Sequence, residues 1–169
     1  MTQATTGALT FRELLDYTAA ESERWHRWLA AQPAEVLELP VGTGRTATVR
    51  GLVHHIVVVE RRYTDRLRGE PVTSYEDVPS DPLDALFGVF ADTRARLEAW
   101  LASATDADLA RRLEFQTLTA GTLSASARKI VIHLLLHGVR HWAQLATALR
   151  QQGHATDWQH DILVSDALD

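Results

Sequence analysis

Four long stretches of the chain repeat apolar side chains every three or four residues, the period of one face of an α-helix. Three of them cover residues 11–31, 48–68 and 124–152, and another begins at Pro82 and carries an apolar stripe to Leu101. Four amphipathic helices without a convincing sheet predict an all-α, four-helix bundle. A length of 169 residues fits a single domain over residues 1–169.

Local signals predict where these helices begin and what separates them. Thr10 and Glu13 have the spacing of a capping box, in which each side chain satisfies an N–H group near the helix start. Asp81 is expected to cap the third helix, with Pro82 at its first position. The segment Leu113–Leu123 alternates loosely and is rich in threonine, which indicates a long loop or a small hairpin before the last helix.

Composition excludes several classes of function. The chain has no cysteine, so disulfides, thiolate metal ligands and a cysteine nucleophile are ruled out. The net charge is −5 and the arginines are scattered among acids, so we expect no nucleic-acid partner. The first residues lack a basic region followed by an apolar run, and the apolar stretches are shorter than the ~20 residues that span a bilayer. We therefore expect a cytoplasmic protein without a membrane partner.

The last helix carries three histidines, His133, His137 and His141, at intervals of one helical turn. With His137 at zero and about 100° per residue, His141 lies at about +40°, inside the apolar stripe. His133 lies at about −40° and Gln144 at about −20°, on the edge of that stripe. A buried imidazole needs partners for both nitrogens, so His137 and His141 are either hydrogen-bonded core residues or ligands of one metal ion.

The second helix offers a third ligand within Leu52-Val-His54-His55-Ile56. His55 shares the core side with Leu52, whereas His54 lies on a mixed face as a neighbour or solvent-facing group. Three neutral histidines leave coordination positions open for water or substrate, which is typical of a catalytic rather than a structural site. Such a site can hold a divalent ion, with Zn or Ni favoured over Fe or Mn.

These residues resemble the DinB/YfiT-like family of bacterial proteins, which are four-helix bundles with a histidine triad. The run Leu52–Ile56 is similar to the family pattern on the second helix and implies His55 as a ligand. The His-x-x-x-His pattern of the last long helix, followed by Gln144, implies His137 and His141. Trp142-Ala143 stands where the family often has Arg-Gly, and a register that pairs His133 with His137 stays open.

The resemblance also implies a type of activity. Characterised relatives look like metal-dependent transferases or isomerases that use a low-molecular-weight thiol such as bacillithiol, mycothiol or glutathione. We therefore expect a thiol S-transferase or a hydrolase with a small-molecule substrate, working as a homodimer. The candidate general bases are His133 and Glu60, although Glu60 could instead be a solvated charge beside Arg61 and Arg62.

A second hypothesis is a non-catalytic, dimeric module that binds a metal or a small ligand. The five tryptophans could supply an interface or a pocket wall for such a module. Tryptophans of a helical bundle are more often part of the core, and this is the interpretation that we favour for Trp25 and Trp100.

Overall fold

The computed structural model describes residues 9–117 and 121–168, and it confirms the four-helix bundle. The long helices are α1 (Phe11–Ala30), α3 (Val49–Arg68), α4 (Leu83–Ser103) and α6 (Ala127–Gln151). The short helices are α2 (Ala34–Leu37), α5 (Asp106–Ala110), η1 (Gly44–Thr46), η2 (Ile162–Val164) and η3 (Asp166–Leu168). No helix in the described ranges is long and apolar enough to cross a membrane. The first eight residues, where we expect no signal peptide, lie outside these ranges, as do residues 118–120 of the expected loop or hairpin.

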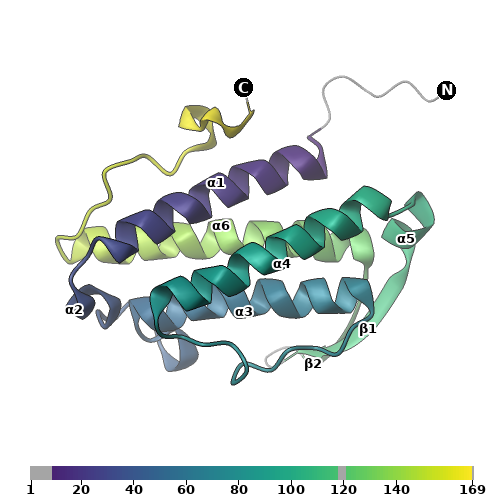
Figure 1. Cartoon of the computed structure of the whole chain (residues 1–169), viewed down its shortest axis with the longest axis horizontal. Helices are drawn as coiled ribbons and strands as arrows, with labels where there is room; N and C mark the ends of the chain where they lie inside the picture. The colour runs from purple at the N-terminus through teal and green to yellow at the C-terminus, as the bar shows by residue number, and fades with distance from the viewer. Residues whose placement is uncertain (1–8, 118–120, 169) are drawn as a thin grey trace.

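The bundle has one long crossover connection. Helices α3 and α4 run in the same direction and α1 and α6 run in the opposite one (Figure 1). α3 packs against both α4 and α6, and α1 packs against the same two helices from the other side. Because α3 and α4 are parallel, segment 69–82 must return along the length of α3, which it does on the outer side of that helix (Figure 1).

A two-stranded hairpin precedes α6, which decides between the two structures expected for this segment. Strands β1 (Arg112–Thr117) and β2 (Gly121–Ser126) are antiparallel, with Arg112 opposite Ser126 and Thr117 opposite Gly121. The alternate side chains Leu113 and Phe115 pack against the bundle core. The hairpin is thus an attachment to the bundle rather than a second layer.

The starts of the four long helices follow local capping, with the exception of α4. Thr10 and Glu13 form the predicted capping box at the start of α1. Asp81 does not cap α4, so that prediction is wrong: its carboxylate accepts a hydrogen bond from Arg50 Nη1 at 2.7 Å, while Pro82 occupies the cap position. α6 begins at Ala127, capped by Ser126, because the preceding residues are paired in β2.

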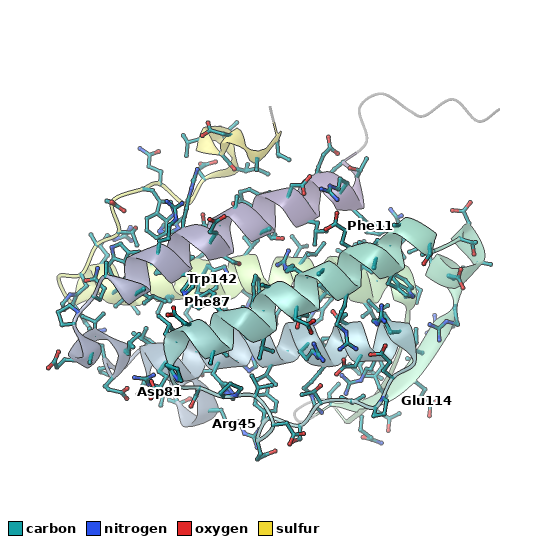
Figure 2. All side chains as sticks on the ribbon, in the orientation of Figure 1. Phe11, Arg45, Asp81, Phe87, Glu114 and Trp142 are labelled. Carbon is teal, nitrogen blue, oxygen red and sulfur yellow. The ribbon has the colours of Figure 1, made fainter. Side chains whose placement is uncertain are left out.

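Two groups of buried apolar side chains fill the bundle. One surrounds Trp25 and Trp142, which stack with ring centroids 5.2 Å apart inside the bundle (Figure 2 labels Trp142). The other surrounds Leu97 and Leu134 nearer the hairpin. Trp25 is fully buried, as expected of a core residue, and Trp100 is half-buried at the margin of the second group. Helices α3 and α6 contribute side chains to both groups. Packing at both ends of these helices therefore fixes the face along which they contact each other.

Candidate metal centre

Three histidines meet where α3 faces α6. His55 comes from α3, and His137 and His141 come from successive turns of α6. One ring nitrogen of each lies within 4.8 Å of the others. The ring centroid of His55 is 5.0 Å from that of each α6 histidine, and those two are 4.4 Å apart. The structure therefore brings together the three residues that the sequence predicts, which we call the histidine triad.

Tight packing of the two helices places the triad. Leu52 and Ile56 are buried on the core side of α3 and set the direction of His55 between them. Gly138 follows His137 and is buried; a β-carbon there would lie 3.9 Å from Ile56 Cγ2, an ordinary van der Waals contact. Gly138 thus lies opposite Ile56 where α6 packs on α3, and the imidazoles lie between the two helices at this level.

Two of the three imidazoles are held through Nδ1. Nδ1 of His55 lies 3.0 Å from the Tyr75 hydroxyl, and Nδ1 of His141 lies 3.0 Å from Gln144 Oε1. The Gln144 amide also donates to the backbone carbonyl of Val41 at 3.4 Å, so its oxygen faces His141. An imidazole that donates through Nδ1–H presents the lone pair of Nε2, the usual arrangement of histidine metal ligands. Hence Nε2 of both residues is available for coordination.

The electrostatics of the site keep the triad neutral. Burial is the main cause, with nearby positive groups second, and together they lower the pKa of His55 to about 4 and that of His137 to about 2. Burial also lowers the pKa of His141, and the hydrogen bond that its Nδ1 makes to the Gln144 amide oxygen opposes this by raising it. Neutral imidazole is the form that binds metals, so the triad is in the binding form at neutral pH.

The donor set fits a divalent transition metal. Three neutral imidazole nitrogens match the ligand number and type of catalytic zinc sites, which leave a fourth position open. The limit of 4.8 Å between ligand atoms exceeds the ~3.4 Å between the nitrogens of a tetrahedral zinc site. That difference is on the scale of small side-chain rotations.

Comparison with known families is consistent with this architecture. The model of the DinB family matches residues 1–163. The chain belongs to the DinB family. No curated protein matches it. In this DinB protein Trp142, which departs from the expected family run, is a core residue: it stacks on Trp25 and donates from Nε1 to Ser22 Oγ at 3.1 Å.

The other predicted site residues have different places. Glu60 is buried and ion-pairs with Arg94, so the view of it as a solvated charge is wrong, and no contact connects its carboxylate to the triad. His133 is exposed and lies outside the triad, with its ring 5.5 Å from that of His137. His54 bonds the carbonyl of Val78 through Nε2 at 3.0 Å.

Tyr75 is the site residue that the sequence did not reveal. It lies in the crossover segment, twenty residues from His55, where no periodicity relates the two positions. Its hydroxyl reaches the triad only because the chain returns along α3.

Proposed function

We propose that this DinB protein binds a divalent metal ion, Zn or Ni in the first place, through His55, His137 and His141. We further propose that it is a metal-dependent transferase that activates a low-molecular-weight thiol, or water, for attack on an electrophilic small molecule. The observation that carries the proposal is the convergence of three imidazole nitrogens within 4.8 Å, with Nδ1 of two rings already engaged.

The chain supplies what such chemistry needs from a protein. A bound divalent ion would lower the pKa of a coordinated thiol or water, giving a nucleophile at neutral pH. Tyr75 and Gln144 orient two of the ligand rings. The chain has no cysteine, so the thiol must come from outside it. His133 is the remaining candidate base, since its ring lies 5.5 Å from that of His137 and the partial burial of its imidazole lowers its pKa.

Metal analysis of protein purified without an affinity tag tests the site. We expect about one equivalent of metal in the wild type and strongly reduced content in His55→Ala, His137→Ala and His141→Ala. His154→Ala, a histidine of the C-terminal tail, is the matched control and should keep its metal. Unchanged metal content in all three triad variants would rule out the site.

A thiol-consumption assay separates an enzyme from a non-catalytic binding module. The metal-loaded protein is incubated with a panel of thiols and electrophiles, and loss of free thiol is followed against the triad variants. If the protein is a transferase, the wild type consumes free thiol and the triad variants do not. Stoichiometric metal binding without consumption across the panel would favour the binding module.

The homodimer stays a prediction from the sequence. Light scattering across a range of protein concentrations measures the molar mass directly. A mass of one chain at all concentrations would contradict it.

A further inference from the structure

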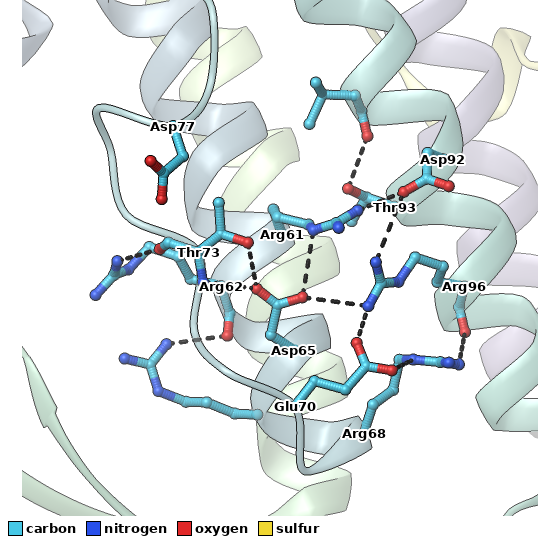
Figure 3. Close-up of polar contacts among 12 residues, drawn as sticks. Arg61, Arg62, Asp65, Arg68, Glu70, Thr73, Asp77, Asp92, Thr93 and Arg96 are labelled. Carbon is cyan, nitrogen blue, oxygen red and sulfur yellow. Dashed lines mark hydrogen bonds and ion pairs between the residues drawn. The ribbon is translucent and has the colours of Figure 1, made fainter.

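The arginines of α3 and its neighbours fall into two groups that differ in their partners. On the side of α3 that faces α4, arginines are paired with buried acids. Asp65 accepts from Arg61 and faces Arg96 at 3.6 Å, as Figure 3 shows, and Glu60 accepts from Arg94 Nη2 at 2.9 Å. These positive charges are thus neutralised within the bundle.

On the side of the triad, three arginines have no carboxylate partner among the described residues: Arg45, Arg62 and Arg140. Arg45 places its guanidinium carbon 4.5 Å from the centre of the Tyr75 ring, and Arg62 lies 5.6 Å from the same centre. The Tyr75 hydroxyl in turn reaches His55. Arg62 donates only to the backbone carbonyl of Thr73, a contact drawn in Figure 3.

Arg140 approaches the triad from α6. It precedes His141 and lies about −60° around the helix from His137, on the same edge as His133. Its side chain is exposed and no contact holds it to another described residue. The positive groups therefore flank the site from both sides: Arg45 of η1 and Arg62 of α3 lie against Tyr75, and Arg140 precedes His141 on α6.

Nearby acids form no ion pair with these three arginines. Glu38 and Asp81 are both paired with Arg50, and neither Asp77 nor the exposed Glu76 forms an ion pair among the described residues.

We propose that the thiol that binds at the triad carries an oxyanion, such as a carboxylate, and that Arg45, Arg62 and Arg140 bind this group. The inference rests on the proposed function and defines its substrate class. Guanidinium groups bind carboxylate and phosphate oxygens in bidentate geometry, and they are most effective where no internal acid competes. A thiol without a further anionic group would supply only its thiolate charge to the ion and would leave the three arginines without an anionic partner.

Binding of matched thiols to the cobalt(II)-loaded protein tests the proposal. The probes are 3-mercaptopropionate, which is anionic, 2-mercaptoethanol, which is neutral, and cysteamine, which is cationic. Absorption from thiolate-to-cobalt charge transfer gives each Kd. We expect the anionic thiol to bind at least about tenfold more tightly than the neutral one, with a preference that falls as salt is added.

Arginine variants assign the effect to these side chains. Arg45→Ala, Arg62→Ala and Arg140→Ala should each weaken 3-mercaptopropionate binding about fivefold and leave 2-mercaptoethanol unchanged. Arg45→Lys should retain part of the preference because it keeps the charge. Arg150→Ala, ten residues further along α6, is the control and should change neither Kd. Competition by acetate and by inorganic phosphate shows which oxyanion the site prefers.

The outcomes distinguish the two proposals. If all thiols give the charge-transfer band with equal affinities, and the arginine variants change none of them, the anion site is overturned while the metal site stands. If cobalt binds but no thiol gives the band, thiol activation fails and the anion inference fails with it.

Discussion

The Tyr75 hydroxyl determines which nitrogen of His55 can face a metal. If the hydroxyl oxygen accepts from Nδ1–H, the lone pair of Nε2 points at the triad. Removal of that oxygen leaves the ring free to rotate and to exchange tautomers. The tyrosine is thus a positioning residue, one step removed from the ion.

Tyr75→Phe should lower metal affinity about 10- to 100-fold, as is typical when the hydrogen-bond partner of a ligand is removed. The aromatic ring stays, so the contacts with Arg45 and the fold should be retained. Competition with a chromophoric chelator measures the affinity, and circular dichroism checks the fold. Tyr63→Phe, a tyrosine beside His133, is the control. Equal affinities in the two variants would show that the Tyr75 hydroxyl does not position His55.

The lowered pKa of His55 predicts how the stability of the metal-free protein depends on pH. The pKa is about 4 in the folded state, against about 6.5 for an unfolded histidine. As pH falls below about 6.5, the unfolded chain takes up the proton first. The contribution to stability is therefore complete above about pH 6.5 and is lost as the pH falls toward 4.

Urea midpoints of the metal-free protein between about pH 7 and pH 5 measure this dependence. The midpoint should fall toward pH 5, and the decrease should be smaller in His55→Gln, which cannot titrate. A variant as pH-sensitive as the wild type would mean that His55 is not protected from protonation.

At the scale of elements, a buried ion pair connects three of the long helices. Arg94 on α4 pairs with Glu60 on α3 and donates to Thr18 Oγ1 on α1 at 2.6 Å and to the Leu15 carbonyl. Burial raises the pKa of Glu60, and the positive charge of Arg94 opposes that rise. The pair therefore fixes how α1, α3 and α4 meet.

Arg94→Ala should destabilise the protein by about 3–5 kcal/mol, because it leaves the Glu60 carboxylate buried without its partner. Chemical denaturation measures the change. Arg12→Ala removes an exposed arginine that pairs with Asp16 and Glu98, and it should change the stability far less. Similar losses in the two variants would contradict a special role for the buried pair.

The sequence predicted the helices well because their apolar faces repeat over many turns. The period locates α1, α3 and α6 to within a few residues. The hairpin stayed ambiguous because its alternation is short and weak. Asp81 was assigned to a cap from local spacing, whereas its partner Arg50 lies 31 residues away in the chain. Errors thus occur where a distant partner outcompetes a local one.

The residues of the site likewise divide into those that helix geometry predicts and those that depend on distant parts of the chain. His137 and His141 share a helix face, so their proximity follows from helix geometry, and the core side of α3 gives His55. Tyr75 and Arg45 could not be found in this way, since both lie outside the long helices and reach the site only through the path of the chain. Glu60 was misjudged because its chain neighbours are arginines, while its partner comes from α4.

At the scale of the whole molecule, the C-terminal tail packs back on α1. Trp158 meets Trp25 edge-on with ring centroids 5.2 Å apart, and its Nε1 donates to the buried Glu21 at 3.2 Å. His160 also reaches that carboxylate and stacks on Trp25. The tail therefore covers the tryptophan core that the helices leave open.

Trp158→Ala should lower stability by about 2 kcal/mol, less than for a fully buried tryptophan because the side chain is half-buried. It should also increase the solvent exposure of Trp25, seen as a red shift of fluorescence. Asp157→Ala, an exposed neighbour, should stay within about 0.5 kcal/mol of the wild type. A stability unchanged by Trp158→Ala would mean that the tail does not contribute to the fold.

The parallel course of α3 and α4 affects how this protein can diversify. It requires a return path along α3, and segment 69–82 carries Tyr75 to His55 and Val78 to His54 on the way. Changes in this segment would alter the surroundings of the triad without touching a helix that holds a ligand. The bundle thus separates the packed helices that carry the three histidines from the connection that forms part of their surroundings.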